Sequence, residues 1–375
     1  MANSNRFLSL DILRGITVCL MILVNSPGTG AETYSYLIHA QWFGFTLADV
    51  VFPTFLFVMG NAMSFSMSRL KQEGQQQFWK KIVKRSLIIF LLGYLMYWFP
   101  FFTTDLDGDI LLKPLSETRI MGVLQRIAIC YFIASILLYY FSLRTVLLIA
   151  ITILFAYWGI LFVFGTAGAE LEMATNAVTK LDLQILGHGH IYKKDSIPFD
   201  PEGILSTLPA IVNVIGGYWA GRFLQKKGKS FETVAKLLVI GYVLIVLALW
   251  WNLIFPIGKK LWTSPFVFLT VGIDLCFLAI LCYLIEIRKE KRGIYFFSVF
   301  GKNPLFIYLF SELFFISLRL IPTASGQDIF EWVSEHVFQN IFPGSLGSFL
   351  TSLVFMLLCW LVGYVLDKKR IYIKL

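Results

Sequence analysis

The sequence has little charge and few cysteines or histidines for its length. Of its 375 residues, 15% are charged and 57% are hydrophobic, and the mean hydropathy is +0.73. One soluble core could not bury that much apolar surface, so lipid must solvate much of the chain. The apolar runs are continuous and do not alternate with polar residues, which excludes a β-barrel. Membrane-spanning helices are therefore expected.

Basic residues outnumber acidic ones, with 32 Lys and Arg against 23 Asp and Glu. They occur in short patches between apolar runs, which is typical of positive-inside topology, and no basic face remains for a nucleic-acid partner. No small-residue cleavage site follows the first apolar run, so we expect an uncleaved span there. The five cysteines fall inside apolar runs, and we expect buried thiols without disulfide or metal roles.

Ten apolar runs are long enough to cross a bilayer as helices of about 20 residues. They cover residues 8–26, 45–67, 82–102, 119–141, 145–164, 203–224, 234–255, 264–287, 294–320 and 346–366. We therefore expect an all-α polytopic transmembrane bundle. Residues 1–375 are treated as a single domain, because neither an internal repeat nor a low-complexity linker divides them. Lys302, Asn303 and Pro304 predict a kink or break in the ninth run.

The distribution of cations predicts that both termini lie in the cytoplasm. With the N-terminus inside, most Lys and Arg residues fall in cytoplasmic connections and in the C-terminal tail. The longer loops, 27–44, 103–118, 165–202 and 321–345, then lie outside. These loops contain all four histidines, His39, His188, His190 and His336. Chemistry that needs a base near neutral pH is therefore expected at the outer face, unless a buried carboxylate serves.

Ionisable residues inside the runs cost about 2.5 to 3.5 kcal/mol each on insertion scales, so each needs a partner or a function. Asp11 and Arg14 lie three residues apart near the cytoplasmic end of the first run. They form either an intrahelical pair or, through Arg14, part of a site for the phosphates of a cytoplasmic donor. Gln125 and Arg126 lie inside the fourth run and predict a polar cavity or a buried carboxylate.

Three further polar residues lie deep in later runs. Asp274, Lys302 and Glu312 are expected mainly to tie helices together, and Lys302 is also a candidate for contact with the donor. The pair His188 and His190 does not have the spacing of a helical metal site, and no cysteine or acidic motif accompanies it. We therefore expect no metal.

The most suggestive cluster joins Asn25, His39 and Asp49. Asn25 ends the first run, His39 lies in the following loop and Asp49 lies in the first turn of the second run, so topology brings all three to the outer mouth of one hairpin. A histidine can take a proton from an attacking amine or hydroxyl, an acid can orient its ring, and an amide N–H can stabilise an oxyanion. Helix capping by Asp49 is the alternative interpretation.

Several motifs together resemble one family. They are residues 6–15 (RFLSLDILRG), 24–25 (VN), 39–53 (HAQWFGFTLADVVFP), 122–126 (GVLQR), 200–205 (DPEGIL), 258–263 (GKKLWT) and 301–305 (GKNPL). This combination resembles the transmembrane acyltransferases typified by heparan-α-glucosaminide N-acetyltransferase and their bacterial relatives. The opening stretch recurs in other membrane acyltransferases, whereas its combination with the His39 segment and the Asp-Pro-Glu-Gly loop is more specific.

The resemblance implies acetyl transfer across the membrane, from cytoplasmic acetyl-CoA to an amino sugar on the extracytoplasmic side. His39 matches the family's catalytic histidine, Asn25 an asparagine at the acetyl group, and Asp49 an orienting acid. We assign the donor to Arg14, Gln125, Arg126 and Lys302. We assign the acceptor to Trp42, Asp200 and Glu202, with helix capping as the alternative for the last two.

The first run suits this assignment, because a helix rises about 16 Å from Arg14 to Asn25 at about 1.5 Å per residue. A pantetheine arm could span that distance. We favour direct transfer over an acetyl-histidine intermediate, since one imidazole and one amide suffice. The chain begins close to its first run, so we expect a bacterial envelope sugar or free amino sugar in place of polymeric heparan. An integral protein of the bacterial inner (plasma) membrane is expected, and the family suggests a homodimer.

Two other functions remain open. A transporter of amino sugars or other small solutes would use the same polar residues as a pathway near the midplane. An O-acetyltransferase of an envelope glycan would use the same base on a hydroxyl group. The clustering of titratable groups at one outer mouth favours an enzyme over a transporter.

Overall fold

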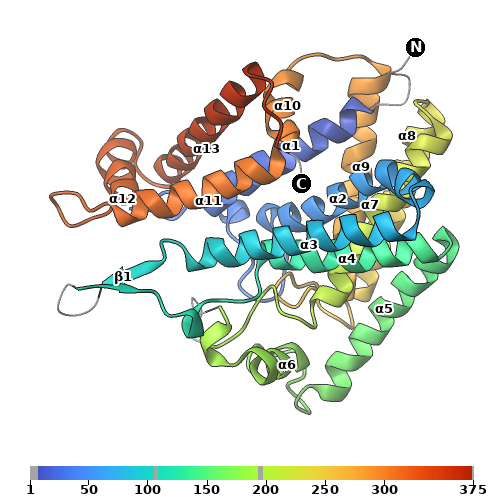
Figure 1. Cartoon of the computed structure of the whole chain (residues 1–375), viewed down its shortest axis with the longest axis horizontal. Helices are drawn as coiled ribbons and strands as arrows, with labels where there is room; N and C mark the ends of the chain where they lie inside the picture. The colour runs from blue at the N-terminus through green and yellow to red at the C-terminus, as the bar shows by residue number, and fades with distance from the viewer. Residues whose placement is uncertain (1–6, 105–108, 193–196, 374–375) are drawn as a thin grey trace. The chain divides into compact units, whose positions relative to one another are not determined.

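The computed structural model describes residues 7–104, 109–192 and 197–373, and thirteen α-helices make up most of them (Figure 1). The predicted all-α fold is confirmed. Its one described sheet is a short antiparallel hairpin of β1 (Phe102–Thr104) and β2 (Ile110–Leu112). Four residues used in the motif and charge predictions, Arg6, Lys193, Lys194 and Lys374, lie outside the described residues.

The chain forms two units. One contains Ala40–Phe45 and Pro53–Ile287, and the other contains Phe7–His39, Thr46–Phe52 and Arg288–Leu375. Helix α2 (Leu47–Gln72) begins in the second unit and continues in the first.

The first unit contains most of α2 and the elements that follow it. These are α3 (Gln75–Trp98), β1, β2, η2 (Leu115–Glu117), α4 (Val123–Tyr140), α5 (Leu143–Phe164), α6 (Ala177–Leu186), η3 (His188–His190), α7 (Thr207–Lys227), α8 (Phe231–Trp251), α9 (Ser264–Leu281) and η4 (Cys282–Ile287). Helix α3 packs along α4, and α8 packs along α9. Helix α7 contacts α4, α5 and α9, so it lies at the centre of these packing interactions.

The second unit is built around α1 (Leu8–Asn25), which contacts α10 (Ile294–Lys302), α11 (Pro304–Leu320) and α13 (Ser345–Lys368). Its shorter elements are η1 (Ser35–Leu37), α12 (Ile329–Val333) and η5 (Ser334–Gln339). Glycines let α1 and α10 approach closely. A Cβ added to Gly15 would lie 1.8 Å from the Phe297 carbonyl oxygen, and one on Gly301 would lie 2.3 Å from the Asp11 carbonyl oxygen.

Each predicted span coincides with one helix or, for the ninth, with a pair of helices. Among the described residues, seven helices are long and apolar enough to cross a membrane: α1, α2, α4, α5, α8, α9 with η4, and α13. The α10–α11 pair bends by 84° at Asn303, which confirms the predicted break and leaves up to eight such spans. Helices α3 and α7 occupy the other two predicted positions but are less apolar. The cytoplasmic placement of both termini stays a prediction.

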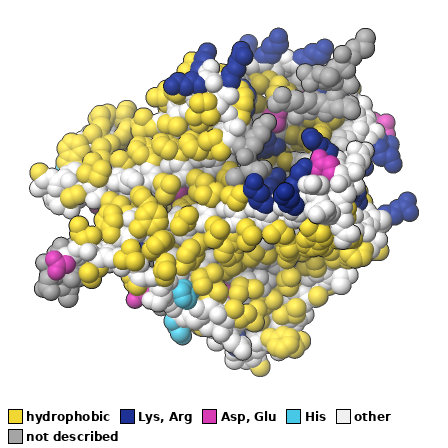
Figure 2. Space-filling model, viewed as in Figure 1, with side chains coloured by type: hydrophobic (Ala, Val, Ile, Leu, Met, Phe, Trp, Pro, Cys, Tyr) yellow, Lys and Arg dark blue, Asp and Glu magenta, His cyan; other side chains and the backbone are white. Residues whose placement is uncertain are grey.

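The surface of the membrane helices is largely apolar. Large hydrophobic side chains on α5 and α8, such as Leu148, Phe155, Tyr242 and Trp250, are exposed in the folded chain. Figure 2 shows hydrophobic side chains over much of the visible face. Water would not solvate such a surface well, whereas lipid would.

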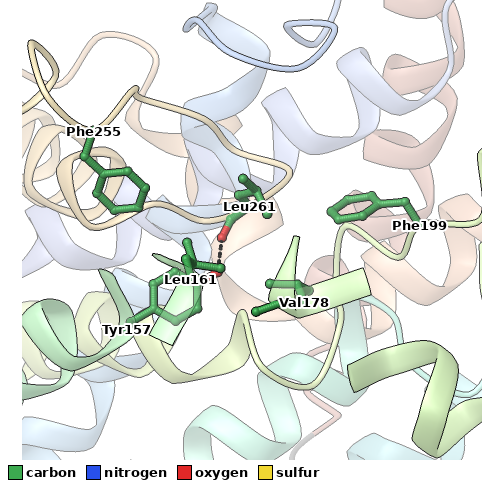
Figure 3. Packing of buried hydrophobic residues seen from close by; sticks show 7 residues of the cluster. Tyr157, Leu161, Val178, Phe199, Phe255 and Leu261 are labelled. Carbon is green, nitrogen blue, oxygen red and sulfur yellow. Dashed lines mark hydrogen bonds between the residues drawn. The ribbon is translucent and has the colours of Figure 1, made fainter. Parts of the chain in front are cut away.

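A buried aromatic and aliphatic cluster joins α5 and α6 to two loops of the first unit. Tyr157, Phe199, Phe255 and Leu261 are fully or almost fully buried in it (Figure 3). The Tyr157 hydroxyl donates a 2.5 Å hydrogen bond to the Leu261 carbonyl oxygen. The cluster therefore fixes the loops on which several candidate site residues lie.

Candidate functional site

The structure brings His39 and Asp49 together in the second unit. His39 Nδ1 lies 2.9 Å from Asp49 Oδ1, with the Asp49 side chain fully buried and the His39 side chain 40% exposed. A buried carboxylate facing Nδ1 favours the tautomer with its proton on that nitrogen, which leaves the lone pair on Nε2. This tautomer is the one required of a general base that acts through Nε2.

The other carboxylate oxygen of Asp49 caps helix α2. Oδ2 accepts hydrogen bonds from the Thr46 backbone N–H at 3.0 Å and from the Thr46 hydroxyl at 3.1 Å. An acid that reaches back to the residue before its helix satisfies one of the backbone donors that a helix start leaves open. Capping and contact with His39 thus occur together, and the cap holds the carboxylate in place for the imidazole.

Asn25 contacts an acid on another helix. Its Nδ2 donates a 3.0 Å hydrogen bond to Glu312 Oε1, which ties the end of α1 to α11. The expectation that Glu312 ties helices is confirmed. Because the carboxylate takes one amide hydrogen, it fixes the amide plane and leaves the second hydrogen of Nδ2 with a defined direction.

Arg14 and Lys302 also lie in the second unit. Arg14 NH1 lies 3.6 Å from Asp11 Oδ1, the predicted intrahelical pair, and 3.4 Å from the Gly301 carbonyl oxygen. Lys302 Nζ lies 2.7 Å from Asp367 Oδ1 and ties α10 to α13. Both cations are part-exposed, so they retain surface for an anionic ligand.

Gln125 and Arg126 are fully buried in α4 of the first unit. Arg126 donates hydrogen bonds to the Ser206 hydroxyl and, at 3.1 Å, to the Gly203 carbonyl oxygen, and its guanidinium lies 4.8 Å from the centre of the Trp262 ring. Within the described part of the chain, Arg126 Nε and NH1 and both amide atoms of Gln125 are buried without a hydrogen-bond partner. These donors, and the Gln125 amide oxygen as an acceptor, fit a polar ligand.

Asp200 and Glu202 form a buried ion-pair cluster with Arg119. Arg119 Nε lies 2.9 Å from Asp200 Oδ2, and its NH2 lies 2.5 Å from Asp200 Oδ1 and 2.6 Å from Glu202 Oε2. Asp200 Oδ1 also accepts from the Glu202 backbone N–H at 2.9 Å. Burial opposes ionisation of Glu202, but the cations Arg119, Arg126 and Lys259 outweigh it and lower its pKa.

Trp42 lines a groove of about 310 Å³ in the first unit, together with Phe43, Phe162 and residues 168–173. Its indole N–H donates a 2.9 Å hydrogen bond to the Leu171 carbonyl oxygen, and its ring meets Phe199 edge to face. These contacts fix the orientation of the indole. Glu170 and Glu172 also line the groove and give it negative charge.

The predicted site residues fall into two sets. Asn25, His39, Asp49, Arg14 and Lys302 belong to the second unit, whereas Trp42, Gln125, Arg126, Asp200 and Glu202 belong to the first. Sequence reasoning did not find the roles of Thr46 and Arg119. Thr46 could have been found as the start of a capping motif with Asp49, but no local signal marked Arg119.

Among the residues that the structure describes, no three His, Cys, Asp or Glu side chains are grouped to hold an ion, and the absence of a metal stays a prediction. His190 Nδ1 instead lies 2.7 Å from the Thr118 carbonyl oxygen.

The apolar helices define an integral membrane protein of the polytopic α-helical class. Residues 6–248 match the family model described as heparan-alpha-glucosaminide N-acetyltransferase, catalytic. The chain belongs to this family.

Two relatives match nearly the whole chain. The mouse heparan-alpha-glucosaminide N-acetyltransferase is 28% identical over 100% of this chain, and the human protein of that name is 28% identical over 99%. The alignments cover 61% and 60% of those relatives, respectively, so the chain spans less than two thirds of their length.

Proposed function

We propose that this protein is a membrane acetyltransferase that moves an acetyl group from cytoplasmic acetyl-CoA to an amino sugar on the extracytoplasmic side. The observation that carries the proposal is the 2.9 Å contact between His39 Nδ1 and the buried carboxylate of Asp49. It supports His39 as a general base, because the carboxylate orients the ring and stabilises the imidazolium that forms when Nε2 takes a proton.

The reaction is a direct transfer. The acceptor amine attacks the thioester carbonyl carbon and forms the C–N bond, while His39 takes the amine proton. Asn25 donates its second Nδ2 hydrogen to the oxyanion, and Glu312 positions that amide. The C–S bond then breaks, and the CoA thiolate leaves and takes the proton from the imidazolium. No acetyl-histidine is needed.

Acetyl-CoA supplies the activated acetyl group. We assign Arg14 and Lys302 to its phosphates, because both are part-exposed cations that can form charge-assisted hydrogen bonds. Within the first unit, Gln125 and Arg126 are proposed to bind a polar substrate group. Their buried polar atoms, which have no hydrogen-bond partner within the described residues, support this role.

The acceptor is proposed to bind at the groove beside Trp42. A fixed indole and nearby carboxylates suit a ring that carries an ammonium group, since aromatic faces and acidic side chains both attract cations. Asp200 and Glu202 are proposed to support acceptor binding through Arg119, which engages both carboxylates. The amino-sugar class follows from the name of the two relatives, heparan-alpha-glucosaminide N-acetyltransferase. The bacterial inner membrane and a homodimer are parts of the same proposal.

Acetyl transfer by the purified protein tests this proposal. Labelled acetyl-CoA and glucosamine should give labelled N-acetylglucosamine with the wild type. His39→Ala should reduce the rate on the order of 10²- to 10⁴-fold. His336→Ala is the matched control, because His336 stacks on Trp332 in a different segment, and it should retain full activity. Absence of product from a folded wild type, or equal rates for His39→Ala and wild type, would reject the proposal.

A further inference from the structure

A carboxylate outside the proposed mechanism is buried beside the Asp200–Ser206 segment. Asp182, on α6, is fully buried, and its Oδ1 accepts a 2.9 Å hydrogen bond from the Ile204 backbone N–H. Its Oδ2 is also buried and has no hydrogen-bond partner among the residues described. A Cβ added to Gly203 would lie 1.8 Å from that oxygen, so only glycine allows the backbone to come this close.

The segment that Asp182 holds carries Asp200 and Glu202. Its first part is fixed by Arg119 and by a hydrogen bond from the Gly203 N–H to the Asp200 carbonyl oxygen at 3.1 Å. Its second part is fixed by Asp182 through Ile204, and by Arg126 through the Gly203 carbonyl oxygen. Among these contacts, only the one from Asp182 is made by a carboxyl group that has no salt-bridge partner within the described residues.

The charged and titratable groups that face Asp182 come from three elements: Asp200 from the segment itself, Arg126 from α4 and Tyr157 from α5. Burial is the largest influence and raises the pKa of Asp182 to about 7, and the negative charge of Asp200 adds to it. The hydrogen bond from Ile204 and the charge of Arg126 act in the opposite direction but are weaker. Asp182 is thus neutral below this pH and ionised above it.

We propose that Asp182 is a proton-dependent positioning residue that keeps the Asp200–Ser206 segment closed when neutral and loosens it when ionised. A neutral carboxyl leaves an uncharged O–H on the buried Oδ2, whereas an ionised one places a full negative charge there against Gly203, which costs far more free energy to bury. Water can hydrate that oxygen only if the segment moves away from α6. We call this contact between Asp182 and the Asp200–Ser206 segment the latch. The latch itself does not depend on acetyl transfer. Its effect on acceptor binding, through Asp200 and Glu202, rests on the proposed function.

The sign follows from linkage. The folded state binds the Asp182 proton more tightly than an open state in which the carboxyl has an ordinary pKa near 3.9. The Asp182 proton therefore stabilises the closed segment fully at a pH below the ordinary pKa. This stabilisation is lost as the pH rises through the raised pKa of about 7. Opening of the segment should increase with pH in this window and level off above it.

Hydrogen exchange followed by mass spectrometry on the full-length protein tests the latch. Amides of residues 203–207, corrected for the intrinsic pH dependence of exchange, should open about 50-fold more at pH 7 than at about pH 5 in the wild type. Asp182→Asn keeps the acceptor oxygen but cannot ionise, so its corrected exchange should be flat with pH. Glu232→Gln removes an exposed carboxylate of the same unit that pairs with Lys236 on its own helix, and it should behave as wild type.

The outcomes separate the latch from the proposed function. Corrected exchange that stays flat with pH in the wild type overturns the latch, whether or not Asp182→Asn folds. A pH dependence that persists in folded Asp182→Asn also overturns it, because another group would then be responsible. If the exchange behaves as expected but no acetyl transfer is found, the latch stands and the proposed function fails.

Discussion

One carboxylate, that of Asp49, contacts His39 with Oδ1 and caps helix α2 with Oδ2. The Thr46 N–H and hydroxyl hold Oδ2, so the oxygen that faces Nδ1 cannot turn away without breaking the cap. Local secondary structure thereby orients the imidazole. This coupling allows the two roles of Asp49 to be separated by substitution.

Asp49→Asn should reduce the rate of acetyl transfer on the order of 10²-fold or more, because an amide can present N–H to Nδ1 and favour the wrong tautomer. Thr46→Ala removes one cap contact but leaves the carboxylate beside His39. It should lower the free energy of unfolding by about 0.5 to 2 kcal/mol and change the rate little. Steady-state kinetics and thermal melting check both variants, and equal losses of rate would argue against an orienting role for Asp49.

Gly15→Ala should destabilise the α1–α10 contact by about 1 to 3 kcal/mol, because the added methyl group would meet the Phe297 carbonyl oxygen. Gly159→Ala, on α5, is the control. Outside its own turn of the helix, no atom lies within 4 Å of a Cβ added there, so the melting temperature should stay the same or rise slightly. If both variants melt alike, the close approach of α1 and α10 is not part of the folded protein.

Arg119→Ala should destabilise the first unit by about 3 to 5 kcal/mol, because it leaves the carboxylates of Asp200 and Glu202 buried without their countercharge. Arg319 also bridges two acids, Asp328 and Glu331, but it is 47% exposed. Arg319→Ala should therefore cost less than about 1 kcal/mol. Chemical denaturation of the two variants measures the difference, and similar losses would contradict the burial argument.

The same ion pair predicts a limb of acid instability. The pKa of Glu202 is lowered in the folded protein, so its stabilisation is present above the ordinary glutamate value near 4.3 and is lost as the pH falls through the folded value. In the wild type, the melting temperature should fall in this acidic range. The melting temperature should fall less steeply with pH in Arg119→Ala, since Arg119 then no longer lowers the pKa of Glu202. An unchanged slope would argue against a stabilising Arg119–Glu202 pair.

Arg14→Ala should raise the KM for acetyl-CoA about tenfold and leave kcat nearly unchanged, because a phosphate contact distant from the acetyl group is equally strong in the ground and transition states. Arg69→Ala is the control, since Arg69 is exposed and pairs with Glu73, which lies just after the end of its helix. An unchanged KM for acetyl-CoA in Arg14→Ala would show that Arg14 does not bind the donor and serves only as the partner of Asp11.

Much of the fold could be predicted because apolar runs of the right length have few alternatives in a membrane. The break at Asn303 was also predictable, since Pro304 removes a backbone donor and Lys302 resists burial in lipid. The assignment of α3 and α7 as spans was less secure. Lysines in the first turns of α3, and polar residues on α7 such as Asn213 and Arg222, reduce their apolar character.

The site was only partly predictable for a different reason. His39 and Asp49 are ten residues apart and meet across one turn, so local topology sufficed to bring them together. Arg119 and Asp200 are 81 residues apart, and their pairing depends on the packing of the first unit. Asp182 meets Ile204 for the same reason, and nothing in its own short helix marks it as buried and unpaired.

Acetyl transfer across a sealed membrane tests the central claim most directly. Vesicles with the cytoplasmic face outward receive labelled acetyl-CoA outside and contain trapped glucosamine. We expect labelled N-acetylglucosamine inside vesicles carrying the wild type and almost none inside those carrying His39→Ala. If unmodified glucosamine instead crosses the membrane at equal rates in both, and no label reaches it, the protein is a transporter and the acetyltransferase assignment is wrong.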